Sequence, residues 1–226
     1  PLMADFQKNK DLVFEQVAQA AQAANRSKDS VNIIAVTKYV DSGVAARLID
    51  TGITHIGENR VDVFLDKYEA LKDRPLTWHL IGSLQRRKVI NVINLVDYFH
   101  ALDSVKLALE IQKRAEHTIK CFLQVNISGE ESKHGFKVSE IDEALAAISE
   151  CDKVELVGLM TMAPKDASGN EINDIFGRAN QIRQELQKRG LPHMPFTELS
   201  MGMSGDFKLA IQNGATFVRI GTSFFK

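Results

Sequence analysis

Eight short apolar runs alternate along the sequence with segments of helical periodicity, and this alternation predicts a (β/α)8 barrel. The runs are apolar at nearly every position, as in parallel strands that helices cover on both faces. An open, doubly wound parallel sheet is the alternative that the same alternation allows. There is no internal repeat and no low-complexity linker, so we expect one domain over residues 1–226.

The expected elements follow from apolar periodicity, from capping residues and from glycines. Strands are predicted at residues 31–37, 53–57, 76–82, 98–102, 119–127, 154–162, 196–200 and 216–221. Helices are predicted over 5–25, 59–72 and 85–95, and five more begin near residues 41, 103, 139, 172 and 207. Asp41-Ser42 and either Asp103 or Ser104 are suitable caps, and Ser139 is followed by Asp142 at the capping-box position. No room remains for a helix after the eighth strand, so the helix at 5–25 is expected to complete the outer ring.

The composition excludes several classes of protein. Of 226 residues, 44% are hydrophobic and 25% are charged, with a net charge of −1, which gives no electrostatic reason to expect nucleic acid or an anionic membrane as a partner. No apolar run approaches the roughly 18 residues of a membrane span, and residues 1–25 lack the pattern of a signal peptide. Cys121 and Cys151 are isolated and form no metal-binding pattern. A cytoplasmic protein without a metal site is therefore expected.

Polar and small residues follow the predicted strands at their carboxyl ends. In a barrel those ends meet on one face, where ligand sites form. The predicted strand starts are not similarly rich. The segments concerned are Lys38, Glu58-Asn59-Arg60, Gly82-Ser83, Asp103, Asn126, Met162, 200–204 and Gly221-Thr222.

Lys38 ends the apolar run that forms the first strand. An ammonium group is costly to bury, so this lysine either points to water just beyond the strand or has a chemical role. The chemical role we consider is to hold pyridoxal 5'-phosphate (PLP) as a Schiff base, which requires the neutral amine for part of the time. A solvated lysine at a strand end is the simpler alternative.

Two segments have the composition of phosphate-binding loops. Residues 199–206 join the seventh strand to a helix and offer hydroxyl groups, glycines and backbone amides. Residues 219–222 close the eighth strand with Gly221 and Thr222, at the position where barrels often bind phosphate. Each loop alone could simply be a tight turn with a helix cap, but two on adjacent strands favour phosphate.

Arg219 and His79 lie inside predicted strands, where polar side chains are unusual. Arg219 either pairs with an internal carboxylate, such as Glu58 or Glu198, or donates to the ring nitrogen of a cofactor. A permanently charged arginine would keep that nitrogen unprotonated and make the ring a poor electron sink. His79 either is a core histidine with satisfied hydrogen bonds or faces the cofactor.

Five motifs in order along the chain resemble the PLP homeostasis protein family of the YggS and PROSC type. They span most of the sequence, and the histidine-glycine-glutamine and SMGMS segments are specific. The motifs are Ala35-Val36-Thr37-Lys38, Gly57-Glu58-Asn59, Trp78-His79-Leu80-Ile81-Gly82 with Leu84-Gln85 and Lys88, Leu199-Ser200-Met201-Gly202-Met203-Ser204, and Arg219-Ile220-Gly221-Thr222.

The resemblance implies a type III PLP fold, which is an alanine-racemase-like barrel without a second domain. It implies that Lys38 forms the Schiff base, that Arg219 faces the pyridine nitrogen, and that Asn59 and His79 line the cofactor. It further implies phosphate contacts from Ser200, Met201, Ser204, Gly221 and Thr222. Lys133 resembles a lysine that makes a second PLP contact.

The family's role implies storage or delivery of PLP, with transient contacts to apo forms of PLP-dependent enzymes, and not catalysis. We expect a monomer, because no second domain completes the site across an interface. An amino-acid racemase is the alternative, but it needs a second acid or base opposite Lys38. Strand alternation should point Tyr39 away, and no other tyrosine or cysteine is well placed. A lysine aldolase acting on a phosphorylated substrate would use the same lysine and loops.

Overall fold

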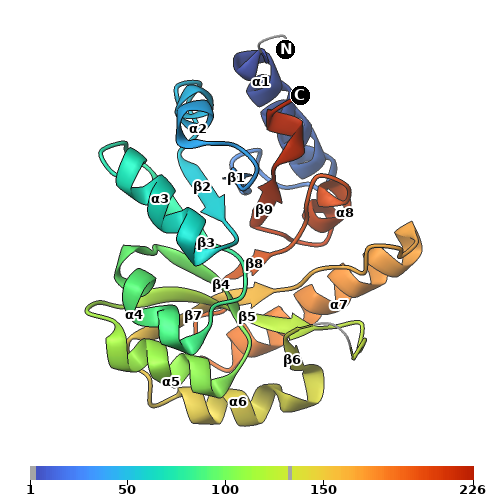
Figure 1. Ribbon diagram of the computed structural model, residues 1–226. Coiled ribbons are helices and arrows are strands. Elements are labelled where there is room, and N and C mark those ends of the chain that lie inside the picture. Colours follow the sequence, from blue (N-terminus) through green and yellow to red (C-terminus); the bar gives the residue numbers. More distant parts are fainter. Residues whose placement is uncertain (1–3, 132–133) are drawn as a thin grey trace.

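The sheet of the computed structural model closes into a parallel barrel with helices around it (Figure 1). The structure describes residues 4–131 and 134–226. The strands are β1 (Asn32–Val36), β2 (His55–Glu58), β3 (Thr77–Leu80), β4 (Tyr98–Leu102), β5 (Ile119–Asn126), β6 (Phe136–Lys137), β7 (Val154–Met160), β8 (Glu198–Ser200) and β9 (Phe217–Ile220).

Two pairings decide between a barrel and an open sheet. The strand order is β4-β3-β2-β1-β9-β8-β7-β5-β6, and an additional pairing joins β4 to β5. That pairing closes the ring, while β9 lies beside β1 with Arg219 opposite Ile34. The two-residue strand β6 pairs with β5 outside the ring and was not predicted. The predicted (β/α)8 barrel is confirmed, and the open-sheet alternative is wrong.

The helices lie between the strands and cover the outside of the barrel (Figure 1). They are α1 (Phe6–Ala23), α2 (Ser42–Ile49), α3 (Val61–Leu71), α4 (Val89–Val92), α5 (Val105–Arg114), α6 (Ile141–Ile148), α7 (Gly169–Lys188) and α8 (Phe207–Gln212), with 3-10 turns η1 (Arg86–Lys88), η2 (Ile93–Leu95), η3 (Val138–Glu140) and η4 (Thr222–Phe224). Asp41 and Ser104 cap α2 and α5 as predicted, accepting hydrogen bonds from the amides of Val44 and Leu107.

Helix α1 completes the outer ring, where it packs beside α2, α8 and the C-terminal turn η4. The Asn9 side chain donates to the backbone oxygens of Phe224 at 3.0 Å and Lys226 at 3.1 Å, which joins α1 to the C-terminal turn. Arg26 donates to the backbone oxygens of Ile211 and Ala215, both at 2.8 Å. Figure 1 shows the blue helix beside the red C-terminal segment. The predicted role of this helix is confirmed.

Three predicted elements differ in detail. The predicted helix 85–95 is broken into η1, α4 and η2, in a stretch rich in β-branched residues, which lower helix propensity. The predicted capping box at Ser139 is wrong, since Glu140 accepts from the Lys137 amide at 2.7 Å and α6 begins at Ile141. Strand β8 begins at Glu198 rather than 196, because Phe196 has a φ of 46°, which no strand residue adopts.

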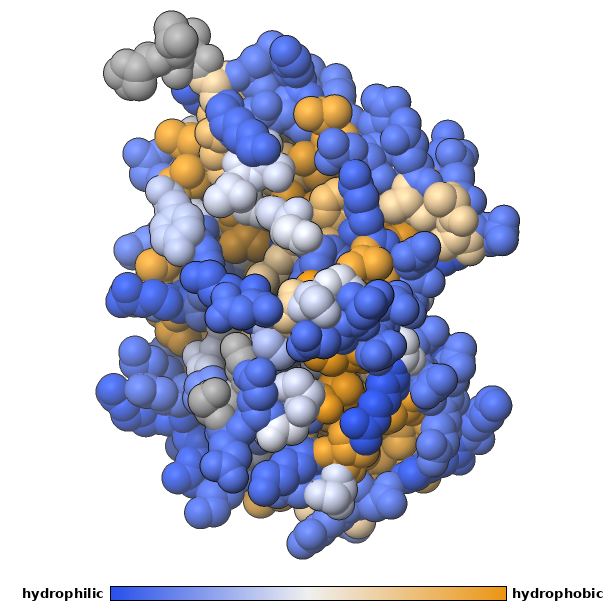
Figure 2. All heavy atoms as spheres, turned by 90° about the vertical axis from the view of Figure 1, so that its right-hand side faces the viewer, coloured by the Kyte–Doolittle hydropathy of each residue, from blue (hydrophilic) through white to orange (hydrophobic). Residues whose placement is uncertain are grey.

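Apolar side chains fill the space between the barrel and the helices, and charged side chains cover the surface. Figure 2 shows one face with mostly hydrophilic residues and smaller apolar areas between them. Among the helices of residues 4–131 and 134–226, none is both long and apolar enough to cross a membrane.

Candidate functional site

A pocket of about 560 Å³ opens at the carboxyl ends of the barrel strands. This volume lies in the range of small-molecule sites. Six residues predicted for the cofactor site line it, and Val36, Tyr39, Ile81, Met162, Met203 and Gly205 complete the lining. The six are Lys38, Asn59, Ser204, Arg219, Gly221 and Thr222.

Lys38 lies in a turn that follows β1. The amide of Val40 donates to the carbonyl oxygen of Thr37 at 3.2 Å, so Lys38 and Tyr39 are the two central residues of the turn. Lys38 is exposed, and its Nζ lies 4.9 Å from the centroid of the Tyr39 ring. Both residues also line an adjoining, largely apolar pocket of about 270 Å³. The amine is therefore accessible from the pocket.

Tyr39 lies at the pocket, and the prediction that strand alternation points it away is wrong. Strand β1 ends at Val36, so the alternation of side chains does not extend to Tyr39. The ring is 82% exposed and lines both pockets beside Lys38. This tyrosine is a pocket residue that the sequence argument missed.

Two chain segments that line the pocket contain backbone amides without a hydrogen bond in the described part of the chain. Among the described residues, the N–H groups of Ser204, Gly205, Gly221 and Thr222 have no acceptor. Gly202 forms the first bend with a φ of +104°, and a Cβ there would lie 2.7 Å from the Cβ of Ala210. With the hydroxyl groups of Ser204 and Thr222, these amides form a cradle suited to an anion.

Arg219 brings an unsatisfied buried cation to the pocket. Its side chain is 3% exposed, and Nη2 donates to the Thr161 carbonyl oxygen at 3.2 Å. Nε and Nη1 have no partner in the described part of the chain. Burial lowers the pKa of Arg219 to about 10, against the opposing effect of Asp206, so the guanidinium stays charged at neutral pH. Two N–H donors are thus free for a ligand.

Neither carboxylate considered as a partner for Arg219 forms an ion pair with it in the described part of the chain. Glu58 forms an ion pair with Lys67, with Nζ and Oε2 at 2.7 Å. Glu198 acts on Arg183, whose pKa it raises against the larger lowering by burial. The prediction of an internal ion pair for Arg219 is therefore wrong for these two carboxylates.

Asn59 reaches the pocket because β3 approaches its backbone closely. A Cβ on Gly82 would lie 2.2 Å from the carbonyl oxygen of Asn59, so only glycine permits this contact. Ile81 lines the pocket from the same strand end. His79 precedes Ile81 by two residues and lies on the same face of the strand but deeper in the barrel.

His79, Ser200 and Met201 are fully buried and do not line the pocket. His79 belongs to a chain of hydrogen bonds through the barrel interior. His55 Nδ1 lies 2.9 Å from His79 Nε2, His79 Nδ1 lies 2.9 Å from His100 Nε2, and His100 Nδ1 lies 2.8 Å from Ser200 Oγ. The structure thus separates these three residues from the other six, one layer beneath the pocket.

Burial sets the charge of this histidine chain. Burial lowers the pKa of His79 and of His100 well below the usual histidine value, and the proximity of the other histidines and, for His100, of Arg219 opposes protonation further. The pKa of His55 is lowered for the same main reason, with Asp97 opposing the shift. The interior histidines are neutral at pH 7, and each can donate from one ring nitrogen and accept at the other.

Lys67 is a buried cation that the sequence argument missed. It lies on α3 and is 3% exposed, while Glu58 is 0% exposed. Its Nζ also donates to the carbonyl oxygen of Thr37 at 2.8 Å, and the Thr37 hydroxyl donates to Glu58 Oε2. The signal was available, because Lys67 falls between Phe64 and Leu71 on the apolar side of the predicted helix.

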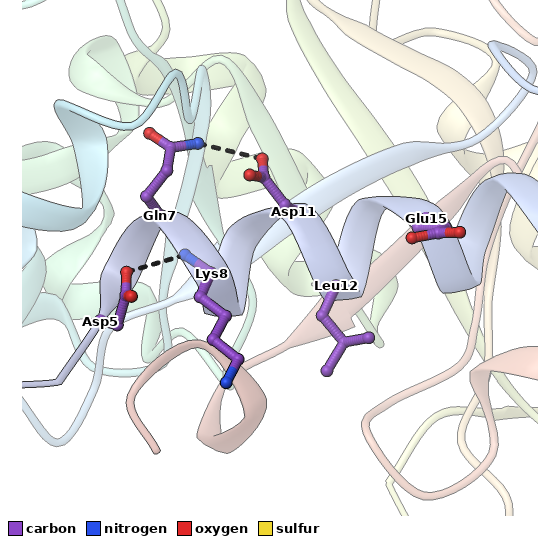
Figure 3. Close-up of a pocket in the computed structure, with 6 residues that line it drawn as sticks. All are labelled: Asp5, Gln7, Lys8, Asp11, Leu12 and Glu15. Carbon is purple, nitrogen blue, oxygen red and sulfur yellow. Dashed lines mark hydrogen bonds between the residues drawn. The ribbon is translucent and has the colours of Figure 1, made fainter.

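The hollow shown in Figure 3 has a similar volume, about 600 Å³, but no features of a binding site. Its labelled residues come from α1 and from Asp5, the N-cap of that helix, and two hydrogen bonds, Gln7 to Asp11 and Lys8 to Asp5, occupy polar groups there. It lies along the surface of one helix, so we do not consider it a site. Lys133 lies outside the residues that the structure describes.

Comparisons with known proteins agree with this arrangement. A sequence model of the alanine racemase N-terminal domain matches residues 13–226. A protein of Aquifex aeolicus (strain VF5), named pyridoxal phosphate homeostasis protein, is 40% identical over 219 residues, covering 94% of each chain. An unknown protein from Bifidobacterium adolescentis has a TM-score of 0.93 at 34% identity, covering 99% of this chain and 98% of its own. PipY of Synechococcus elongatus PCC7942, solved with PLP bound, has a TM-score of 0.82 at 34% identity, covering 93% of this chain and all of its own.

Proposed function

The chain belongs to the pyridoxal phosphate homeostasis proteins, a family with the alanine racemase N-terminal fold, and on that basis we propose that it binds PLP and acts in intracellular PLP homeostasis. Storage or delivery of the cofactor is the proposed role. The observation that carries the proposal is the buried guanidinium of Arg219, whose Nε and Nη1 have no partner among the described residues at the pocket that Lys38 also lines.

The residues of the pocket fit the parts of PLP. Unpaired amides and hydroxyls of Ser204 and Thr222 suit the phosphate, and the free N–H groups of Arg219 suit a ring nitrogen that accepts a hydrogen bond. Apolar side chains of Val36 and Ile81 can cover the ring faces. PLP supplies an aldehyde that condenses with a primary amine, with loss of water, and Lys38 is the amine we assign to it.

The chain's own groups favour retention of the cofactor over carbanion chemistry. Arg219 remains protonated at neutral pH, so it acts as a donor and leaves a pyridine nitrogen without a proton. A ring in that state withdraws electrons weakly. In this proposal His79, Ser200 and Met201 act indirectly, by supporting the pocket from the layer beneath it.

The visible spectrum tests this proposal. Purified protein incubated with PLP should become yellow, and borohydride reduction should attach the label to Lys38. Lys38→Ala should bind PLP without the coloured adduct, while the control Lys8→Ala, on the outside of α1, should behave as wild type. A wild-type protein that stays colourless with added PLP would overturn the proposal and favour the lysine aldolase.

Amino-acid racemisation is a second candidate, favoured by the position of Tyr39 beside Lys38. Cys121 and Cys151 are buried and line neither of the two pockets near Lys38. Loss of optical activity from a single-enantiomer amino acid, dependent on both Lys38 and Tyr39, would establish this activity. We further propose that residues 1–226 act as one cytoplasmic, monomeric domain that contacts apo forms of PLP-dependent enzymes transiently. Size-exclusion chromatography with light scattering tests the oligomeric state.

A further inference from the structure

A buried ion pair lies directly beneath the turn that carries Lys38, on the side of β1 and β2 that faces the helices. Lys67 extends from α3 and contacts both strand ends, with Nζ 2.8 Å from the Thr37 carbonyl oxygen and 2.7 Å from Glu58 Oε2. The Thr37 hydroxyl donates to the same carboxylate oxygen. One ammonium group thus joins the last polar positions of two neighbouring strands.

The cost of this arrangement argues that it has a role beyond packing. Both ions are almost entirely withdrawn from water, with 3% of Lys67 and none of Glu58 exposed. Glu58 Oε1 has no hydrogen-bond partner among the described residues. Apolar residues of the same size would fill the space without this desolvation, and in some proteins a buried ion pair is retained because it fixes one arrangement of the chain.

The arrangement that Lys67 fixes is the turn of Lys38. The Thr37 carbonyl oxygen accepts from two donors, the ammonium of Lys67 and the amide of Val40 that closes the turn. Lys38 follows Thr37 directly and is itself exposed, so the backbone on its N-terminal side is its only buried anchor in the described structure. Movement of the Thr37 carbonyl would therefore move the start of the Lys38 side chain.

We infer that Lys67, with Glu58 as its counter-ion, is a positioning residue that holds the Lys38 amine in the geometry for covalent PLP binding. The inference rests on the proposed function and extends it to residues that do not line the pocket. A displacement of about 1 Å can reduce the rate of a bond-forming step by up to about a hundredfold. Loss of the Lys67 contact should therefore weaken the bond to PLP more than it weakens the phosphate contacts, which come from β8 and β9.

The test compares Lys67→Met with the double variant Glu58→Gln/Lys67→Met. Methionine keeps an unbranched side chain of similar size, and the double variant avoids a buried unpaired carboxylate if the single variant fails to fold. Both should trap roughly ten- to a hundredfold less borohydride-fixed PLP at Lys38 in a short incubation.

A measurement without cofactor separates positioning from general loss of stability. Hydrogen exchange at the Val40 amide should accelerate in the Lys67 variants, because the carbonyl that accepts it has lost its anchor. Leu145→Ala, in α6 on the β5–β7 side of the barrel, is the stability control. At a matched melting temperature it should keep wild-type exchange at Val40 and wild-type labelling of Lys38.

Two results would overturn the inference while leaving the proposed function intact. One is wild-type labelling of Lys38 in the folded double variant. The other is equal loss of labelling in Leu145→Ala at the same melting temperature. Failure of the wild-type protein to bind PLP at all would instead reject the proposed function.

Discussion

Two clusters of buried polar side chains in this barrel compensate for the loss of water in different ways, one by an ion pair and the other by hydrogen bonds between neutral groups. The cluster of Thr37, Glu58 and Lys67 lies between the barrel and α3 and is charged, whereas the chain from His55 to Ser200 lies in the barrel interior and is neutral. The charged cluster holds a chain segment through one strong donor. The neutral chain satisfies polar groups beneath the pocket at a lower cost in desolvation.

Both clusters lie next to the pocket but do not line it. A barrel can therefore use buried polar residues to support a binding site from outside that site. Each cluster ends near a pocket segment, at Thr37 directly before Lys38 and at Ser200 three residues before Met203. In the charged cluster, the ammonium group of Lys67 holds a single backbone carbonyl, that of Thr37. Hydrogen bonds through neutral rings join four strands, β2, β3, β4 and β8, across the interior.

The largest expected effect is the loss of one partner of the ion pair. Lys67→Met leaves the Glu58 carboxylate buried and unpaired, and should lower the free energy of unfolding by about 3–5 kcal/mol. Urea unfolding measures the loss. The double variant Glu58→Gln/Lys67→Met should recover much of it, and equal losses in both variants would contradict the assignment of the cost to the unpaired charge.

Breaking the chain of hydrogen bonds between the interior histidines should lower the free energy of unfolding by less than breaking the ion pair does. His79→Leu removes the partner of His55 and of His100, and with it a ring stacked on Tyr98 at 4.9 Å. We expect the free energy of unfolding to fall by about 1–3 kcal/mol. The same urea experiment applies, and a loss larger than that of Lys67→Met would reverse the comparison between the clusters.

Acid should destabilise the protein through the neutral chain. Because burial lowers the pKa of His79 and His100 in the folded state, the unfolded chain binds protons below about pH 6.5 that the folded chain does not. Each histidine should therefore lower the free energy of unfolding by up to about 1.4 kcal/mol per pH unit below that value, and contribute no slope above it.

Unfolding curves at a series of pH values test this slope. The curve of His79→Leu should fall less steeply below pH 6.5 than the wild-type curve, by the contribution of one histidine. His117→Gln changes an exposed histidine and should follow the wild type. Parallel curves for wild type and His79→Leu would show that the interior histidine does take up a proton in the folded state.

The smallest effect is expected at the exposed neighbour of Lys38. Tyr39→Ala removes a ring that is 82% exposed and lies 4.9 Å from Lys38 Nζ, so the free energy of unfolding should change by less than about 0.5 kcal/mol. Thermal unfolding of the apo-protein measures it. A loss above about 1 kcal/mol would show that Tyr39, and not only the buried Lys67, holds this turn.

The sequence by itself determined the barrel, because continuous apolar strands and amphipathic helices follow from the local order of side chains. It also determined which residues come together at the strand ends. Lys38, Asn59 and Gly221 follow strands whose carboxyl ends must share one face in a parallel barrel, and Arg219 lies near the end of one of these strands. Local periodicity was sufficient to predict the barrel and the residues at the carboxyl ends of its strands.

Only the tertiary structure decided how deep each side chain lies and what it pairs with. His79 and Ser200 share a strand face with pocket residues but lie one layer lower, and the burial of Lys67 depends on two strand ends distant in the sequence. Tyr39 reaches the pocket because β1 ends at Val36, three residues before it, so strand alternation does not extend to this side chain. Depth and pairing arise from contacts between distant segments, so no local pattern contains them.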